Sequence, residues 1–558
     1  MIAFFKRHKE IAILIVLAFI LGLGNPLFDY PLAFTVGDEF ESQKVALETL
    51  SSKSLVHSSA YLPLWTWVQT PFLVLAILFT KILGGYPSFE AVKQEVLLFS
   101  PGAFLFVPRI LSSLFSALSL IWLFKLGNVL KSKRVGLLAA LLFSFTFMRV
   151  HQASFGRVTS VYLFASLGFL YYLISYVKSA NPKHMYLVIG FLTASIAAYP
   201  MGIALLPLVI TVLFFFSTTR SVLHTRRFWL LILLNVGVLG MLVAITPGIL
   251  LSYFPQISIT SQTLTLGSKF LFYVRTLLWY DLPVVVLGMV GLRVLCLKTG
   301  KTGVIIWLFG IVACLPFLVK GTAEPRYIFL LFIPFIVSAS FFLDTLLTQR
   351  KLPAYLLIGL TILLSLIPVV RFKFLLYRKS TYLLAKDYLE KEIPQNKPLL
   401  VNRNNFYLLP SLESQEPKEL FSDPYYQSLR SILSTMKKGE IEKMKQVKFI
   451  HSLSNMRMLA KKANFTVETD KYDFVVFDYY TQGEKQVLME EIRFNPKNYE
   501  LVKTFSPADS FIPLPSLLNI HNPYKHLFSV DRFGPYFEVY EKNENEEIKD
   551  SDKANARF

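Results

Sequence analysis

Long apolar blocks separated by short polar segments make up the first two thirds of the chain. A helix needs about 20 consecutive apolar residues to cross a bilayer, and most of the blocks have that length. This pattern predicts a mainly α-helical, polytopic membrane protein. The blocks lie at about 11–25, 63–83, 103–125, 134–150, 158–177, 185–216, 228–251, 283–297, 302–319, 327–347 and 352–370.

The block at 185–216 is too long for one span, because about 20 residues suffice. It contains Tyr199–Gly202, which includes a proline and a glycine and is typical of a turn. Both flanks of the block are basic, and two helices joined at this turn place both flanks on the same side of the membrane. We therefore predict two spans here.

The block at 63–83 is predicted not to cross the membrane. If it crossed, the basic loop at 125–134 would lie opposite the basic N-terminus, against the tendency of basic loops to stay on the cytoplasmic side. Its first half also mixes Trp65 and Gln69 with apolar residues, as interfacial helices do. We expect an outer-face juxtamembrane helix over 61–83, a cytoplasmic N-terminus and about 11 transmembrane helices.

From Arg371 onward, charged and turn residues become frequent. This change predicts a transmembrane domain over 1–370, an extracytoplasmic α/β domain over 371–540 and a polar, disordered tail over 541–558. The expected strands of the α/β domain lie at 398–401 and 474–477, and its expected helices at 386–391 and 440–447.

The composition agrees with a membrane protein. Of the 558 residues, 54% are hydrophobic and only 17% are charged, against about 25% charged residues in a typical soluble domain. The net charge of +20 does not indicate a nucleic-acid partner, because most basic residues of the first two thirds lie in loops between apolar blocks. Cys296 and Cys314 fall in or beside apolar blocks, so we expect neither a disulfide framework nor a cysteine metal site.

The longest loop between predicted spans, 26–102, carries the adjacent acids Asp38 and Glu39. Acidic residues favour the first turn of a helix, so the pair is also typical of a solvated helix start. Ionisable residues at membrane level are, however, costly and are commonly functional. A carboxylate at this place can take a proton from an incoming hydroxyl group.

Several residues of the predicted outer loops are candidate substrate ligands. The planar guanidinium of arginine suits phosphate oxygens. Arg109 can equally extend its charged end to the membrane surface without binding a ligand. His151 can equally cap a helix end, and Arg157 can anchor one at the interface. An acid facing several cations at the outer surface fits sugar transfer from a lipid phosphate. The candidates are Tyr61, Arg109, His151, Arg157, Lys320, Arg326 and Tyr327.

These features resemble the GT-C class of polytopic glycosyltransferases, and within it the protein O-mannosyltransferase and lipid A aminoarabinose-transferase group. The resemblance covers roughly residues 1–370 and rests on the order of short motifs rather than on one long signature. The motifs are Asp38-Glu39 in the first outer loop, Tyr61–Leu64 before the juxtamembrane helix, Arg109 at the second span and Arg326-Tyr327 at a late span.

The resemblance implies an enzyme that moves a monosaccharide from a polyprenyl-phosphate donor to an acceptor hydroxyl of a protein, lipid or glycan. The reaction would take place at the outer face of a plasma membrane, among membrane lipids. The resemblance implies that Asp38 is the base that activates the acceptor, that Glu39 shapes the acceptor site and that Arg326 holds the donor phosphate.

One feature departs from the family. Many relatives carry a second acid in the next outer loop, but residues 151–160 contain none. A divalent cation is compatible with the family but is not supported here by a second acid, and no other cofactor is expected.

Two alternatives remain at the level of the sequence. A flippase or transporter of lipid-linked glycans would show ionisable residues near the middle of the bilayer and internal repeats, and the chain shows little of either. A non-catalytic membrane receptor would tolerate substitution of Asp38.

Overall fold

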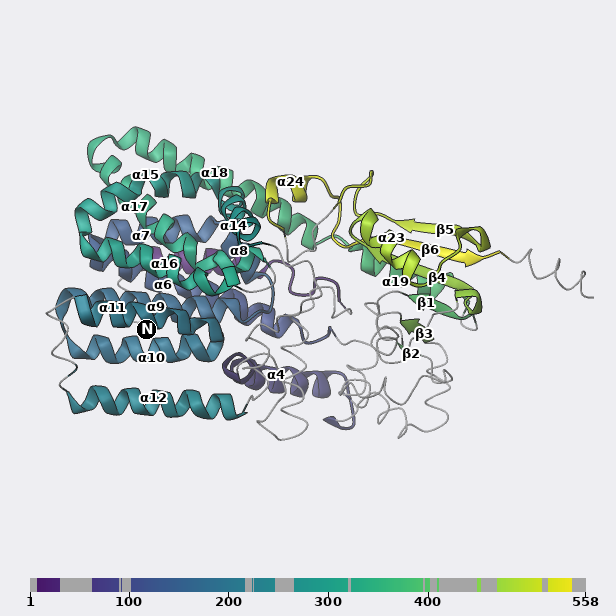
Figure 1. Cartoon of the computed structure of the whole chain (residues 1–558), viewed down its shortest axis with the longest axis horizontal. Helices are drawn as coiled ribbons and strands as arrows, with labels where there is room; N and C mark the ends of the chain where they lie inside the picture. The colour runs from purple at the N-terminus through teal and green to yellow at the C-terminus, as the bar shows by residue number, and fades with distance from the viewer. Residues whose placement is uncertain are drawn as a thin grey trace, which may run out of the picture.

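An α-helical bundle and a smaller α/β domain lie end to end in the computed structural model of the chain (Figure 1). The predicted fold class, mainly helical with a C-terminal α/β domain, is confirmed. The structure describes residues 8–30, 63–89, 92, 102–215, 223, 225–245, 265–319, 323–394, 397–401, 409–410, 449–452, 469–513 and 520–543.

Every apolar block predicted to span the membrane coincides with a helix of the bundle. Long runs of leucine, isoleucine, valine and phenylalanine form helices here because the membrane core offers no other partner for the backbone amides. The bundle helices are α2 (Lys9–Leu23), α6 (Phe106–Leu130), α7 (Lys133–Phe145), α8 (Phe147–Ala153), α9 (Thr159–Ser179), α10 (Pro182–Ala198), α11 (Leu206–Phe215), α12 (Arg226–Ile245), α15 (Leu282–Thr299), α16 (Lys301–Val319), α17 (Phe332–Gln349) and α18 (Lys351–Leu376).

By length and composition, seven helices in the described part of the chain are able to cross a membrane, or eight if the bent pair α7–α8 is one span. One of the seven is α4 (Pro63–Leu83), which was predicted not to cross, so length and composition alone do not support that prediction. The chain is therefore a multi-pass membrane protein, while the position of α4 has to be decided from its contacts.

Two breaks divide apolar blocks. The block 185–216 is split as predicted, because α10 ends at Ala198 and a 3-10 helix, η2 (Pro200–Leu205), begins with a proline that cannot continue the helix. The block 134–150 was predicted as one span, but its helices α7 and α8 meet at an angle of 62°. Thr146 between them has an extended backbone, with φ −61° and ψ 133°.

The helices of the bundle approach most closely where small residues lie between them. On α15, a Cβ atom added at Gly288 would lie 2.6 Å from the carbonyl oxygen of Phe335 on α17. Glycine at this position therefore allows the two backbones to touch, as small residues do between membrane helices.

One end of the bundle, named here the basic end, carries the basic segment between α6 and α7. Lys131 and Arg134, between α6 and α7, both pair with Asp344 near the end of α17, the former at 2.6 Å. Lys133 pairs with Glu10 at the start of α2 at 2.9 Å. The start of α2, the segment between α6 and α7 and the end of α17, which the positive-inside rule assigns to one side of the membrane, thus meet at one end of the molecule.

The opposite end of the bundle, named here the domain end, faces the α/β domain in Figure 1. The last bundle helix, α18, continues to Leu376 and so passes the domain boundary predicted at residue 370. Tyr524 donates to the carbonyl oxygen of Leu364 at 2.9 Å, and Arg371 donates to the carbonyl oxygen of Leu527 at 3.0 Å. These bonds attach the α/β domain to α18.

The α/β domain contains a six-stranded sheet in the order β2-β3-β1-β4-β6-β5. The strands β1, β2, β3 and β4 are paired in parallel, whereas β6 is antiparallel to β4 and β5. The strands predicted at 398–401 and 474–477 and the helix predicted at 386–391 are present, while 440–447 lies outside the described residues. The elements are α19 (Thr381–Lys391), β1 (Leu399–Val401), β2 (Leu409–Pro410), β3 (Phe449–Ser452), η6 (Thr469–Lys471), β4 (Phe474–Tyr479), α23 (Gln482–Glu491), η7 (Pro496–Asn498), β5 (Tyr499–Phe505), α24 (Pro523–Phe528) and β6 (Tyr536–Lys542).

Candidate functional site

The predicted site residues divide into two groups. Asp38, Glu39, Tyr61 and Lys320 lie outside the described residues. The others, which the structure does place, are Arg109, His151, Arg157, Arg326 and Tyr327.

Arg326 and Tyr327 share one acidic partner. They lie in the 3-10 helix η4 (Pro325–Leu331), which begins with a proline after the extended residue Glu324. The carboxylate of Glu324 pairs with Nε of Arg326 at 2.6 Å and accepts a hydrogen bond from the hydroxyl of Tyr327 at 3.0 Å. The guanidinium also lies over the Tyr327 ring, 5.3 Å from its centroid. Glu324 thus binds both candidate ligands of the donor phosphate.

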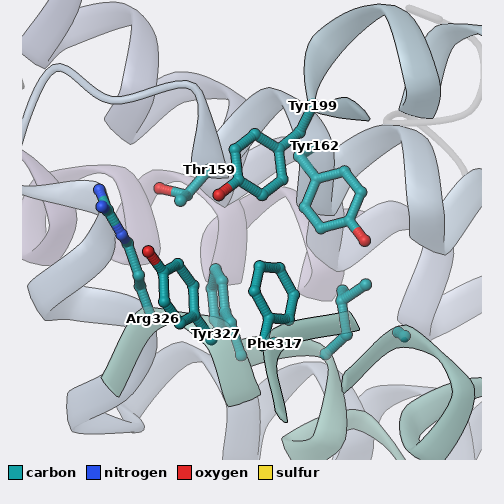
Figure 2. A pocket seen from close by; sticks show the side chains of 9 residues that line it. Thr159, Tyr162, Tyr199, Phe317, Arg326 and Tyr327 are labelled. Atoms are coloured by element: carbon teal, nitrogen blue, oxygen red, sulfur yellow. The ribbon is translucent and has the colours of Figure 1, made fainter. Parts of the chain in front are cut away.

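An aromatic pocket adjoins Arg326 (Figure 2). Its wall is a stack in which the rings of Tyr327 and Phe317 are 4.3 Å apart and 7° from parallel, and Phe317 stacks in turn on Tyr199. Figure 2 shows Phe317, Arg326 and Tyr327 on one side of the pocket and Thr159, Tyr162 and Tyr199 on the other. Helices α9, α10 and α16 meet η4 here, so the pocket exists only when all four elements are packed. It is lined by Thr159, Tyr162, Tyr199, Ala313, Phe317, Arg326, Tyr327, Phe329 and Leu330.

His151 does not line this pocket but is connected to it. Its ring is fully buried and packs against Phe147, Phe155, Tyr280 and Phe372. A short polar chain runs from the His151 ring through Gln152 to Thr159 in the pocket wall, with heavy-atom distances of 3.2 and 3.5 Å. In this structure His151 therefore supports the wall rather than facing the pocket.

Arg109 holds the chain just past the end of α2, at the start of the loop between α2 and α6. Its side chain is 1% exposed, and Nη1 donates to the carbonyl oxygens of Pro26 and Phe28 at 3.1 and 2.9 Å. Predicted as a substrate ligand, it instead fixes the segment that leads from α2 toward Asp38. Arg157 is also buried, at 2% exposure.

The helix α14 (Leu266–Tyr280) is amphipathic, with an apolar exposed face and polar groups on its buried face. It exposes Leu266, Phe270 and Trp279 by 63%, 60% and 45%. A helix with this arrangement can lie in the membrane interface with its apolar side toward lipid. Its buried residues, spaced as one helical face, are Lys269, Tyr273, Thr276 and Tyr280.

The buried face of α14 reaches the pocket. Nζ of Lys269 lies 3.5 Å from the carbonyl oxygen of Leu318. The hydroxyl oxygen of Tyr273 lies 3.5 Å from the carbonyl oxygen of Phe317. Burial raises the pKa of Tyr273, and the nearby Tyr327 and Glu324 raise it further. Tyr273 therefore keeps its proton and can act as a hydrogen-bond donor beside the pocket.

Lys269, Tyr273 and Tyr199 were not predicted as site residues from the sequence. For Lys269 and Tyr273 the signal is their spacing of four residues on an aromatic, weakly basic helix. Nothing in the sequence indicates that Tyr199 stacks on a ring of α16.

The site combines an arginine, an acid and several aromatic hydroxyls at the domain end of a membrane bundle. Such a set can bind an anionic, amphiphilic ligand whose apolar part stays in the bilayer. Within the described ranges, no group of three or more histidine, cysteine, aspartate or glutamate side chains is arranged to hold a metal ion.

No protein-family model matches the chain, and no curated protein matches it in sequence. Two solved proteins are similar to it in structure. ArnT from Cupriavidus metallidurans bound to undecaprenyl phosphate is 11% identical, with a TM-score of 0.49 over 95% of this chain and 97% of that chain. The archaeal oligosaccharyltransferase AglB from Archaeoglobus fulgidus, in complex with an inhibitory peptide and a dolichol-phosphate, is 12% identical, with a TM-score of 0.44 over 93% of this chain and 77% of that chain.

Proposed function

We propose that the chain is an integral membrane glycosyltransferase. It takes a monosaccharide from a polyprenyl-phosphate donor and joins it to a hydroxyl group of a protein, lipid or glycan acceptor. The reaction takes place at the domain end of the bundle, which we assign to the outer face of a plasma membrane because the basic loops gather at the other end.

The placement of Arg326 is the observation that carries this proposal. Its side chain is 17% exposed, at the domain end, between the carboxylate of Glu324 and the ring of Tyr327. Few residues recognise a phosphate as well as an arginine, whose planar fork can bind two oxygens at once. A polyprenyl phosphate would place its phosphate at Arg326 and keep its chain in the bilayer.

The proposed chemistry is a single displacement. The acceptor oxygen attacks the anomeric carbon, the bond from that carbon to the phosphate oxygen breaks, and the configuration inverts. The acceptor proton passes to Asp38, and the lipid phosphate leaves with its negative charge held by Arg326. A leaving group whose charge is already neutralised does not require a general acid. Glu39 would shape the acceptor site beside Asp38.

The experiment is a reconstituted transfer assay with the full chain. Undecaprenyl-phosphate monosaccharides are supplied with candidate acceptors, and acceptor-dependent release of undecaprenyl phosphate is measured. Asp38→Asn keeps the size and capping ability of the side chain but cannot take a proton, so transfer should fall by about 10²–10⁴-fold with donor binding unchanged. Glu39→Gln should cost less, because neighbouring helix positions point about 100° apart.

Arg326 is tested by binding. Arg326→Ala should weaken binding of undecaprenyl phosphate by roughly ten- to a hundredfold, and Arg326→Lys by less, because an ammonium group keeps the charge but loses the fork. Arg275→Ala, at an exposed basic residue of α14, is the matched control and should change little. Unchanged affinity in Arg326→Ala, or full activity in Asp38→Asn, would remove the corresponding residue from the mechanism. Movement of lipid-linked sugar across the bilayer without transfer would favour a flippase.

A further inference from the structure

Helix α4 buries three polar atoms that form no hydrogen bond. The side chains of Trp65 and Gln69 are both 0% exposed. Within the part of the chain that the structure describes, neither the indole nitrogen of Trp65 nor the amide oxygen and nitrogen of Gln69 has a hydrogen-bond partner. The two residues are one helical turn apart, so these atoms lie on the same face of α4.

Such a group of atoms needs an explanation. More than nine in ten buried polar groups in proteins are hydrogen-bonded, because each unbonded one costs free energy. An apolar side chain of similar size would fill the same space without this cost. Polar atoms that weaken the fold are expected where they bind something that is added later.

The orientation of α4 places this face toward the protein. Its exposed face carries Leu75, Leu78 and Ile82, which are 50%, 37% and 65% exposed and suit contact with lipid. With this face in the membrane interface, Trp65 and Gln69 are directed inward, as is Leu73, which is 0% exposed. The polar atoms are therefore shielded from both bulk water and lipid.

The position of α4 brings these atoms near the candidate site. Leu64 and Trp67 at its start pack against Ala197, near the end of α10. Two residues further along the chain, Tyr199 forms part of the pocket beside Arg326. Figure 1 shows α4 at the domain end, between the bundle and the α/β domain. The start of α4, which carries Trp65 and Gln69, and the pocket thus adjoin the same end of α10.

The chemistry of the face selects its ligand. An indole N–H and an amide offer two kinds of donor and one acceptor without a formal charge. This set suits neutral hydroxyl groups, which both donate and accept, and it does not compensate the charge of a phosphate. The indole ring adds an apolar surface of the kind that packs against the C–H face of a sugar.

We propose that Trp65 and Gln69 form a subsite for the hydroxyl groups of a sugar, carried either by the polyprenyl-phosphate donor or by the acceptor. This inference rests on the proposed function, because Arg326 provides the phosphate contact that brings a glycosylated lipid to this end of the bundle. Trp65 and Gln69 then decide which sugar is accepted.

The test uses the full chain with Gln69→Met, which keeps bulk but removes the polar atoms, and with Trp65→Phe, which removes the indole N–H together with part of the ring. The thermal unfolding temperature of Gln69→Met should stay the same or rise, since no hydrogen bond is lost, whereas that of Trp65→Phe should fall because a cavity is left. Binding of bare undecaprenyl phosphate should not change. If the subsite holds the donor sugar, the preference for undecaprenyl-phosphate hexoses, pentoses or amino sugars over the bare lipid should fall about tenfold. If it holds the acceptor, the acceptor KM should rise about tenfold with donor binding unchanged.

Thr70→Val is the matched control, because the Thr70 hydroxyl is already bonded to the carbonyl oxygen of Thr66 at 2.8 Å. It should alter neither sugar preference nor acceptor KM. A clear fall in the unfolding temperature of Gln69→Met would mean that the amide is bonded within the fold, and would overturn the subsite. So would unchanged donor preference and unchanged acceptor KM in both variants. A wild-type chain that binds neither bare nor glycosylated lipid overturns the proposed function itself, whereas loss of lipid binding in Arg326→Ala alone leaves that function standing.

Discussion

Arg109 and Phe28 join the two helices on either side of the first outer loop. The guanidinium of Arg109, at the start of α6, donates to the carbonyl oxygen of Phe28, just past the end of α2, at 2.9 Å. The chain therefore leaves the bundle after α2 and returns to it at α6 at the same end. Helix α4 lies within this excursion, and a single crossing by α4 would carry the chain to the wrong end.

This relationship predicts that α4 does not cross the membrane. In a chain whose native cysteines are replaced, Ser88→Cys just after α4 and Lys503→Cys in the α/β domain should react with a membrane-impermeant thiol reagent added from outside. Gln349→Cys at the basic end should react only after the membrane is opened. All three positions are exposed. If Ser88→Cys reacts only after the membrane is opened, as Gln349→Cys does, then α4 spans the bilayer.

Glu324 is predicted to compete with the donor phosphate for Arg326. Its carboxylate is in contact with Nε of Arg326, and a unit charge at such a distance contributes on the order of 1–4 kcal/mol near a protein surface. Glu324→Gln removes the charge but keeps an oxygen for the Tyr327 hydroxyl, so undecaprenyl phosphate should bind about fivefold or more tightly. Glu324→Ala should bind undecaprenyl phosphate less tightly than Glu324→Gln, because alanine offers no oxygen to accept the hydrogen bond from the Tyr327 hydroxyl. Equal weakening in both variants would instead assign a positioning role to the charge.

Asp281 is predicted to hold the bent helix α8. Its two carboxylate oxygens accept from the backbone nitrogens of Phe147 and Met148 at 3.0 and 3.3 Å, although it lies more than a hundred residues away in the chain. Asp281→Ala leaves two buried N–H groups unbonded and should cost roughly 2–4 kcal/mol of unfolding free energy. Thr265→Ala removes an exposed cap of α14 and should cost about 1 kcal/mol or less. Equal losses in a detergent unfolding experiment would argue against the role of Asp281.

The attachment of the α/β domain is predicted to weaken in acid. Burial lowers the pKa of His526 on α24 to about 4, and the neighbouring His521 and Lys525 add to the effect. In the unfolded chain His526 binds a proton near pH 6.5, whereas in the folded chain it binds one only near pH 4. The free energy of unfolding therefore decreases as the pH falls through this range. The loss should be on the order of 3 kcal/mol.

His526→Gln tests this prediction, because glutamine does not titrate. The wild-type unfolding temperature should fall between about pH 6.5 and pH 4, and the variant should show a smaller fall. Parallel curves for the two proteins would mean that other groups, such as carboxylates elsewhere in the chain, cause the acid sensitivity.

The sequence by itself determined the helices of the bundle, their order, the division of the long block at Pro200 and the strands at 398–401 and 474–477. These features depend on local hydropathy, on proline and on the alternation of apolar residues, all of which can be read along a short stretch of chain. The amphipathic pattern of α14 can likewise be read from the sequence of that helix alone. The motif Arg326-Tyr327 was found because it lies directly before a span.

Only the tertiary structure decided what these residues touch. Tyr199 stacks on Phe317, which stacks on Tyr327, although Tyr199 lies more than a hundred residues earlier in the chain than the other two. Arg109 and His151 have the chemistry of substrate ligands, yet packing directs one to backbone carbonyl groups and buries the other among aromatic rings. A residue type reports which bonds a side chain is able to make, but the partner is chosen by long-range packing, which no local pattern encodes.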